Sequence, residues 1–344
     1  MNELIAGVLD GRARAIARLL TLVENSESAA ETAVTALYPH TGQAHIIGIT
    51  GPPGSGKSTL VNEIAKRLRQ QGQRVGILAI DPSSPFTGGA LLGDRVRMRD
   101  LAGDSGVFIR SMASRGSLGG LAQATWAAIK VLDAAGFAKI LVETVGAGQA
   151  EVDIARAAHT TLVVEAPGMG DDVQAFKAGI LEIADILVVN KADRPGSERV
   201  VRSLELMLHL GPMGGTRHHG RILTATIPAA NGTSSGWQIP VLPATASEGR
   251  GTAELVTQIQ QHLAHLQMSG EWQEREQERC RHELRQLLQM RLLARLDTAV
   301  SQNEQDALVT AVAAREIDPY TAVRQLLNHF PANHEVSGKS ASTT

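Results

Sequence analysis

Residues 51–59 read Gly-Pro-Pro-Gly-Ser-Gly-Lys-Ser-Thr, and they directly follow the apolar run 44–50. Glycines here allow backbone N–H groups to close around phosphate oxygens, and a helix expected over 59–70 would direct the positive end of its dipole at the same anion. Lys57 would place its charge on the β- and γ-phosphates, and the Ser58 hydroxyl could ligate Mg²⁺. This order of strand, loop and helix predicts a nucleotide phosphate site. Its expected residues are Gly51, Pro52, Pro53, Gly54, Ser55, Gly56, Lys57, Ser58 and Thr59.

A second motif, Asn190-Lys-Ala-Asp193, closes the apolar run 186–189 and indicates which base is bound. Guanine presents two N–H donors on one edge, and the Asp193 carboxylate can accept both in a strong, charge-assisted pair. Adenine has no matching pair of donors, so the same carboxylate would select against ATP. The Asn190 amide can tie the surrounding loops together, and the Lys191 stem can cover the base. Together with the phosphate loop, this motif predicts a GTP site.

Acidic residues at or near strand ends are candidates for holding a metal ion. Asp81 follows the apolar run 75–80, and Asp94 lies thirteen positions later in Gly-Asp-Arg-Val-Arg. Glu143 begins Glu-Thr-Val-Gly146, where GTPases usually have an aspartate, and Gly146 could offer its N–H to a γ-phosphate. Mg²⁺ prefers oxygen ligands and keeps several waters, so one or two carboxylates beside Ser58 are enough. We expect Ser58, Asp81, Asp94 and Glu143 as metal ligands; the alternative for each acid is a surface carboxylate.

Apolar runs alternate with helical stretches along the chain, at 44–50, 74–80, 107–110, 138–143, 161–165, 186–190 and 239–243. Continuous Val/Ile/Leu runs are typical of strands that are buried on both faces. The alternation predicts an α/β fold, a mostly parallel sheet flanked by helices. The expected organisation is an N-terminal helical extension (1–43), a P-loop GTPase domain (44–268), a C-terminal helical arm (269–332) and a disordered tail (333–344). Residues 211–238, rich in Gly, Ser and Thr, are expected to form a surface loop or hairpin.

The amino-acid composition limits which binding partners and which cellular compartment we expect for the protein. The 344 residues include 33 basic and 35 acidic side chains, so no polyanion-binding surface is implied and nucleic acid is not an expected partner. A single cysteine, Cys280, excludes an intrachain disulfide and a Cys-pair metal site. No uncharged apolar run reaches membrane-spanning length, and the first residues do not form a signal peptide. We therefore expect a cytoplasmic protein that does not bind membranes.

Five segments between residues 51 and 193 resemble the MeaB/ArgK family of GTPases, whose bacterial type is the methylmalonyl-CoA mutase-associated GTPase. They are GPPGSGKST (51–59), DPSSPFTGGALLGDRVRM (81–98), ETVGAGQAEVD (143–153), GDDVQAFKAGILEIAD (170–185) and NKAD (190–193). The resemblance covers residues 1–330 and weakens through 211–238. It implies the signal-recognition/MinD-like class of P-loop NTPases. The fifth GTPase motif, usually Ser-Ala, would be Thr245-Ala246, whose backbone N–H groups could meet the guanine O6.

The resemblance also implies a function and an assembly. Family members are homodimers that act as GTP-driven chaperones of adenosylcobalamin-dependent acyl-CoA mutases, typically methylmalonyl-CoA mutase, and they gate cofactor loading and protect the mutase. The Mg²⁺-associated acids of the family fall on Asp81, Asp94 and Glu143 of this chain. Its mobile, partner-responsive loop falls on 166–177, with Lys177 nearest the chemistry. Family dimer contacts fall on 271–330, where the leucine stripe 284–296 would pack either within the chain or across a two-fold axis.

Hydrolysis of GTP needs positioning and charge neutralisation more than covalent chemistry. We expect Lys57, Asp94, Glu143 and Lys177 to supply the catalytic charges. Ala147 stands where a Ras-type enzyme has its water-positioning glutamine, so basal hydrolysis should be slow. Gln149 or Lys177 could complete the site, although each could equally be an ordinary helix residue.

Two other functions are compatible with a phosphate loop. A small-molecule kinase usually lacks the NKxD motif, which argues against that class. A nickel-type metallochaperone would need a metal site, for which His209, His218 and His219 are candidates. However, His218 and His219 form a lone pair in a Gly-rich loop, with no cysteine or acidic partner nearby in the sequence. A cobalamin-mutase chaperone therefore remains the leading hypothesis.

Overall fold

The computed structural model describes residues 1–25, 28–82, 99–101, 103–114, 120–144, 154–168, 183–209, 216–218, 221–223 and 236–328. The chain divides into two compact units, residues 1–282 and 283–344. Within the described residues, no helix is both long and apolar enough to cross a membrane.

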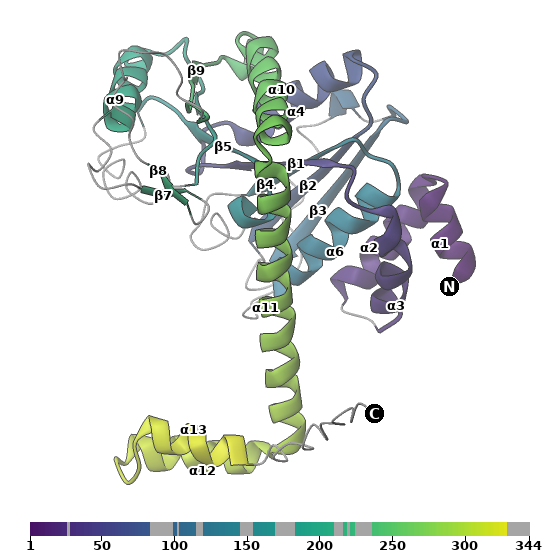
Figure 1. The fold of residues 1–344 in the computed structure, drawn as a ribbon, viewed down its shortest axis with the longest axis vertical. Helices are drawn as coiled ribbons and strands as arrows, with labels where there is room; N and C mark the ends of the chain where they lie inside the picture. Colours follow the sequence, from purple (N-terminus) through teal and green to yellow (C-terminus); the bar gives the residue numbers. More distant parts are fainter. Residues whose placement is uncertain are drawn as a thin grey trace, which may run out of the picture. The chain divides into compact units, whose positions relative to one another are not determined.

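The first unit is built on a seven-stranded sheet of order β3-β2-β4-β1-β5-β6-β9 (Figure 1). Every neighbouring pair is parallel, so all the carboxyl ends of the strands meet at one edge. β1 lies in the middle, where its Ile47 pairs with Leu141 of β4 and with Thr160 of β5. The strands are β1 (His45–Thr50), β2 (Val75–Pro82), β3 (Val107–Ser114), β4 (Lys139–Thr144), β5 (Thr160–Glu165), β6 (Ile186–Val189) and β9 (Val241–Pro243).

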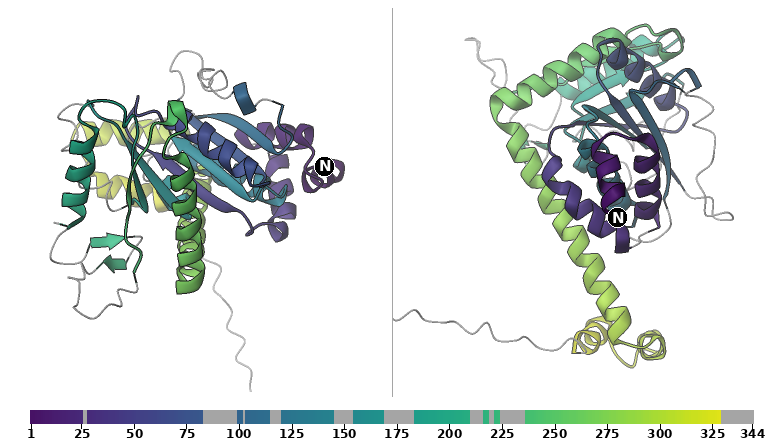
Figure 2. Two further views of the ribbon diagram at one scale, coloured as in Figure 1. Left: turned by 90° about the horizontal axis from the view of Figure 1, so that it is seen from above. Right: turned by 90° about the vertical axis from the view of Figure 1, so that its right-hand side faces the viewer.

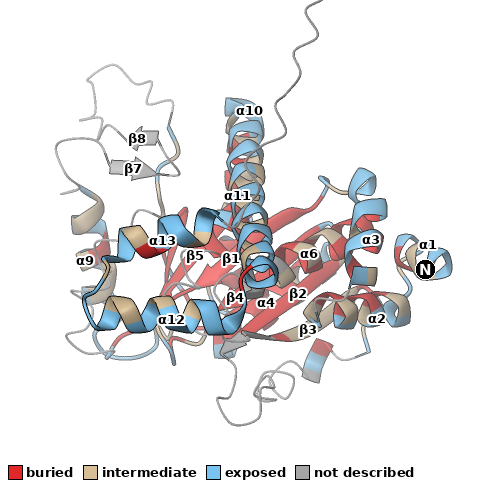
Figure 3. Cartoon of the chain, turned by 90° about the horizontal axis from the view of Figure 1, so that it is seen from below, coloured by how far each residue is buried: buried red, intermediate tan, exposed pale blue. Residues whose placement is uncertain are grey.

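Helices cover both faces of the sheet, which is why β1, β4, β5 and β6 are buried at every residue. Alternate residues of each strand point to opposite faces. Ile46 joins the core beneath α6 (Gly120–Ala134), whereas Ile47 joins the core beneath α4 (Lys57–Gln70) and α10 (Thr252–Ser269). A smaller core lies between β5, β6 and α9 (Ser197–His209). Figure 3 shows the strands as the buried centre of this unit. The predicted α/β fold with a parallel sheet is confirmed.

Three N-terminal helices pack on the α6 side of the sheet (Figure 2). They are α1 (Asn2–Leu9), α2 (Ala13–Glu24) and α3 (Ser28–Leu37), followed by the 3-10 turn η1 (Tyr38–His40). Ile16, Leu19 and Leu20 are fully buried at helical spacing. The link to β1 is held by Asp133 of α6, whose carboxylate accepts the backbone N–H groups of residues 42, 43 and 44.

The second unit contains the end of α11 (Glu271–Ala299) together with α12 (Gln302–Ala313) and α13 (Pro319–Asn328). Ser301 caps α12, and Glu304 returns the bond to the backbone of Ser301, forming a capping box. The leucine stripe of α11 is largely exposed, at 67% for Leu284 and 60% for Leu288. This unit therefore leaves apolar surface uncovered.

Local boundaries differ from the sequence-based expectation in two places, and a third segment agrees with it. α4 begins at Lys57 rather than at residue 59, because Gly56 takes a left-handed conformation and acts as the N-cap. The boundary between the compact units lies inside α11, whereas the helical break lies at Gly270, which ends α10. In the expected loop or hairpin, β7 (Thr216–His218) and β8 (Arg221–Leu223) form an antiparallel pair, and residues 224–235 lie outside the described part.

Candidate functional site

The phosphate loop runs from the carboxyl end of β1 to the first turn of α4. Gly51 has φ +139°, and a Cβ there would lie 2.1 Å from the carbonyl oxygen of Val164 in β5. Gly56 has φ +92°, and a Cβ there would lie 2.4 Å from the side-chain nitrogen of Asn190. Only glycine avoids both the clash and the backbone strain. The two glycines thus let the loop approach β5 and the Asn190 segment closely.

Lys57 is held inside this loop. Its side chain is buried, and its ammonium donates to the carbonyl oxygens of Gly51 at 2.7 Å and Pro52 at 3.0 Å. Lys57 is also the first residue of α4, where the leading N–H groups have no acceptor within the helix. The ammonium and the positive end of the helix dipole therefore act at one place, which suits a polyanionic phosphate chain.

A serine hydroxyl and a carboxylate meet beside the loop. Ser58 Oγ donates to Glu143 Oε1 at 2.6 Å, and both side chains are buried. Ser58 comes from the first turn of α4, and Glu143 comes from β4, opposite Ile49 of β1 and Ala79 of β2. Asp81 lies two residues beyond Ala79, at the same edge of the sheet, and its side chain is outside the described part. The structure thus brings two of the four expected metal ligands into contact.

Several expected residues lie outside the described part of the chain. They are Asp94, Gly146, Ala147, Gln149 and Lys177. Thr59 is described and is exposed on α4, away from the buried face that Lys57 and Ser58 share.

A threonine pair beside Glu143 was not anticipated from the sequence. Thr144 Oγ1 donates to Thr50 Oγ1 at 3.1 Å, and both residues are buried. They are the last residues of β4 and β1, so the bond joins the two strands where the phosphate loop begins. A hydroxyl residue that ends an apolar strand is the signal that could have identified each of them.

Asn190 joins the phosphate loop to the segment after β9. Its side-chain amide donates to the Ser55 carbonyl at 2.8 Å, and its side-chain oxygen accepts the Ala246 N–H at 3.1 Å. Its own backbone N–H donates to the carbonyl of Glu165 at the end of β5. Asn190 thereby ties three segments together, as its place in the motif suggests.

The rest of the NKxD motif lies along the loop. Lys191 has φ +56°, a conformation uncommon for a residue with a side chain, and its ammonium donates to the Gly54 carbonyl at 2.5 Å. The N–H of Ala192 donates to the carbonyl of Ala244, just after β9. Asp193 is exposed, so its carboxylate is accessible to a ligand.

Thr245 and Ala246 form a closed turn after β9. Thr245 exchanges two backbone hydrogen bonds with Arg250, which encloses the short helix η3 (Ala246–Glu248). Both Thr245 and Ala246 are buried. The Ala246 N–H, which we expected near the guanine O6, is directed at Asn190 instead, because the Asn190 side-chain oxygen lies within hydrogen-bonding distance. Ala246 therefore positions the motif through its backbone.

Of the three histidines considered for a nickel site, His209 alone has a described side chain. Within the described residues, no group of three His, Cys, Asp or Glu side chains is arranged to hold a metal ion. His209 bonds the carbonyl of Glu205 in its own helix, and only the backbone of His218 is described. His219 lies outside the described part.

Comparison with known proteins identifies the family. The sequence profile of the family "Methylmalonyl Co-A mutase-associated GTPase MeaB" matches residues 16–301. A protein of Pyrococcus abyssi is 45% identical over 330 residues, which cover 96% of this chain and 97% of that protein. GTPase ArgK of Escherichia coli is 34% identical over 267 residues, covering 76% of this chain and 81% of ArgK.

A solved structure agrees with the sequence comparison. The crystal structure of a LAO/AO transport system kinase aligns with 95% of this chain and 96% of its own, with a TM-score of 0.69 and 26% identity. The resemblance drawn from the sequence motifs is thus confirmed. The chain belongs to the family of methylmalonyl-CoA mutase-associated GTPases, MeaB, and it is a P-loop GTPase.

Proposed function

We propose that this GTPase binds Mg²⁺–GTP at the carboxyl edge of its sheet and acts as a chaperone of an adenosylcobalamin-dependent acyl-CoA mutase, with methylmalonyl-CoA mutase the first candidate. The main support for the nucleotide site is the pair of hydrogen bonds that the Asn190 side chain makes, one to the phosphate loop and one to the backbone of residue 246. Membership of the mutase-associated family supports the partner.

In this proposal the phosphate groups lie against Lys57 and the first turn of α4, and guanine lies against Asp193. Lys57 would exchange its carbonyl acceptors for the β- and γ-phosphate oxygens. Lys191 covers the base with its carbon chain, while its ammonium remains at the Gly54 carbonyl. Gly146 would complete the phosphate contacts, and the turn at Thr245 and Ala246, tied to Asn190, would border the base.

The residues present fit a magnesium ion. Ser58 and Glu143 bring a hydroxyl and a carboxylate oxygen within 2.6 Å of each other, and oxygen is the ligand that Mg²⁺ prefers. Asp81 and Asp94 are the further candidate ligands. When bound, the ion would neutralise charge on the phosphate oxygens.

The chain's own contribution to hydrolysis is positioning and charge. Lys57 and the helix amino end stabilise negative charge on the phosphates, which is the main requirement of phosphoryl transfer to water. Ala147 cannot orient a water molecule, so we propose that the resting enzyme is slow and that Lys177 or Gln149 completes the site. An arriving mutase that favours the completed site would raise turnover.

We further propose a homodimer formed through the C-terminal helices. Leu284, Leu288, Leu292 and Leu293 are each at least 45% exposed on α11. Val309 and Tyr320, on the two following helices, are also exposed. A self-complementary apolar surface of this kind is typical of two-fold assemblies.

Steady-state GTP hydrolysis with and without purified methylmalonyl-CoA mutase tests the chaperone function. We expect the mutase to raise kcat by about tenfold or more, a barrier change of about 1.4 kcal/mol. Lys177→Ala should lose most of this stimulation and little basal activity, whereas Lys57→Ala should lose nearly all turnover and keep its circular dichroism spectrum. Failure of any mutase to bind would contradict the chaperone role, and equal stimulation of wild type and Lys177→Ala would contradict the role of Lys177 alone.

A kinase is the second candidate, because the similar solved structure is that of a LAO/AO transport system kinase. Following the γ-phosphate of GTP by phosphorus NMR, with and without small-molecule acceptors, separates the two activities. Release of inorganic phosphate alone supports the GTPase chaperone, and a phosphorylated acceptor supports the kinase.

A further inference from the structure

Asp185 lies directly before β6, at the amino edge of the sheet and away from the nucleotide site. It is 1% exposed, and its carboxylate accepts two hydrogen bonds from the Arg275 guanidinium, at 3.0 and 2.8 Å. It also accepts the Thr161 N–H at 2.8 Å, and His262 Nε2 lies 3.4 Å away. Burial alone would raise the pKa of Asp185, but the charge of Arg275 holds it well below its ordinary value. Asp185 is thus a buried, ionised carboxylate.

The same residue also holds the segment that enters β9. Trp237 donates its indole N–H to the Asp185 carbonyl at 2.8 Å, and the N–H of Leu187 donates to the Pro240 carbonyl at 2.9 Å. The amino ends of β6 and β9 are therefore both attached at or beside Asp185.

The opposite ends of these two strands carry the proposed guanine site. β6 has four residues and is followed at once by Asn190, and β9 has three residues and is followed by Ala244. Such strands span only about 10–13 Å. β9 is the last strand of the sheet, so its one strand neighbour is β6. The position of both base-recognition segments therefore depends on how the amino ends of β6 and β9 are held.

We propose that the Asp185–Arg275 pair is a positioning device for guanine recognition. By joining α11 to the start of β6, it fixes where residues 190–193 and 245–246 meet the base. The proposal rests on the base site proposed above.

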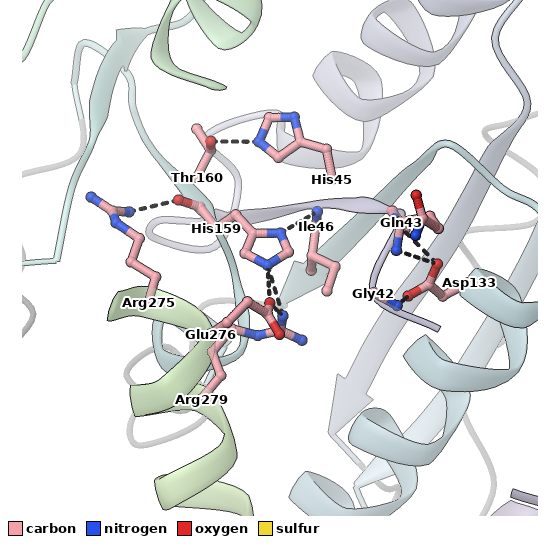
Figure 4. A network of polar contacts seen from close by, with 11 residues as sticks. Gly42, Gln43, His45, Ile46, Asp133, His159, Thr160, Arg275, Glu276 and Arg279 are labelled. Carbon is pink, nitrogen blue, oxygen red and sulfur yellow. Dashed lines mark hydrogen bonds and ion pairs between the residues drawn. The ribbon is translucent and has the colours of Figure 1, made fainter. Parts of the chain in front are cut away.

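Two features separate this role from general stabilisation. A buried ion pair contributes little net stability compared with apolar residues of similar size, and defined geometry is the benefit that we propose for this pair. Arg275 also donates to the His159 carbonyl at 2.6 Å, so one guanidinium sets the spacing of the β5 and β6 starts (Figure 4).

The same helix provides a matched control. One turn after Arg275, Arg279 pairs with Glu276, whose carboxylate accepts the His159 ring N–H (Figure 4). This contact also joins α11 to the sheet, but at the start of β5, whose carboxyl end leads to residues 166–168 rather than to a base-recognition segment. Substitution of Arg279 removes this contact and leaves the Arg275–Asp185 pair in place, so β6 and β9 should not move.

The test compares the affinity of the full-length protein for fluorescent GDP and IDP, because inosine lacks the 2-amino group that Asp193 would bind. The main variant is Asp185→Asn/Arg275→Gln, which removes both charges together and leaves no unpaired ion in the core. We expect its GDP-to-IDP affinity ratio to fall by about tenfold, the loss of one hydrogen bond to a charged group. Affinity for IDP should change little, and Arg279→Gln should keep the wild-type ratio.

A folded double variant that keeps the wild-type GDP-to-IDP ratio would overturn the proposal. The proposal would also be overturned if Arg279→Gln lowered this ratio as much as the double variant does. If the double variant does not fold, Arg275→Lys decides: a lysine cannot make the two-pronged contact, and an unchanged ratio in this folded variant counts against the proposal. Asp193→Asn is measured alongside. If Asp193→Asn keeps the wild-type GDP-to-IDP ratio, the base site itself is assigned wrongly. If Asp193→Asn lowers the ratio but the variants at 185 and 275 do not, only the positioning role is wrong.

Discussion

Ser58 and Glu143 are joined by a 2.6 Å hydrogen bond between the first turn of α4 and the end of β4. The bond links the segment that would hold phosphate to the strand that offers a carboxylate. We therefore expect changes at either residue to appear first as altered metal dependence.

Glu143→Gln should raise the Mg²⁺ concentration needed for half-maximal GTP hydrolysis and lower kcat by about 100-fold, because an amide is a weaker ligand than a carboxylate. Hydrolysis measured over a magnesium titration checks this. Asp133→Asn, which alters a buried carboxylate bound to residues 42–44, is the control and should leave the metal dependence unchanged. An unaltered magnesium profile in Glu143→Gln would remove Glu143 from the metal site.

Asp193→Asn should weaken GTP binding by about 2–4 kcal/mol and improve binding of xanthosine triphosphate. An asparagine can donate to the xanthine carbonyl, which an aspartate cannot. Calorimetric titration with both nucleotides measures the exchange. Glu198→Gln, on the exposed face of α9, should alter neither affinity.

Acid should destabilise the first unit through His159. Burial lowers the pKa of this imidazole to about 4, although the neighbouring Glu276 acts in the opposite direction. Its Nδ1 accepts the Ile46 N–H, and a protonated ring could not do so (Figure 4). An unfolded histidine binds its proton at a pH of about 6.5, so the unfolded state gains protons first. Stability should then fall by roughly 3 kcal/mol between pH ~6.5 and ~4.

Urea unfolding from pH 7 to pH 4 measures this loss. His159→Asn keeps an acceptor near the Ile46 N–H but does not titrate, so the midpoint should depend less on pH than in wild type. A remaining slope is expected, because burial also lowers the pKa of His45 well below its ordinary value. Burial acts to raise the pKa of Glu276, but the bond to His159 and the charge of Arg279 lower it to about 2. The loss of stability caused by protonating Glu276 therefore continues to a lower pH than the loss caused by His159. Identical pH profiles for wild type and His159→Asn would exclude His159 as the source.

Leu284→Glu/Leu288→Glu should convert the proposed dimer into a monomer that still binds GDP, because like charges would face each other across the two-fold axis. Light scattering on the full-length protein checks it. Truncation near Gly270 would be a poor test, since it removes Arg275 and Glu276, which pack into the first unit. A dimer that persists in the double variant would place the interface elsewhere.

The sequence reveals the parts of the fold and site that depend on local patterns. Continuous Val/Ile/Leu runs predict parallel strands because helices cover both faces, and the phosphate loop follows from closely spaced glycines. The Arg275–Asp185 pair could not be found this way, since 90 positions separate its partners and Arg275 lies outside every quoted motif. The direction of the Ala246 N–H was likewise set by Asn190, 56 positions away. Contacts between residues so far apart in the sequence leave no repeating pattern from which they could be predicted.

The strand order also determines when the nucleotide site can form during synthesis. β1 carries the phosphate loop near the start of the chain, but its neighbours come much later: 94 positions separate His45 from Lys139, and 113 separate Ile46 from His159. The loop therefore lacks its supporting strands until β5 has left the ribosome, and the base-recognition turn follows about 80 residues after that. Pairing over such distances is slow, and the unpaired apolar strands are prone to aggregation. A protein proposed to assist another enzyme should thus itself be most prone to aggregate while its chain is still being synthesised.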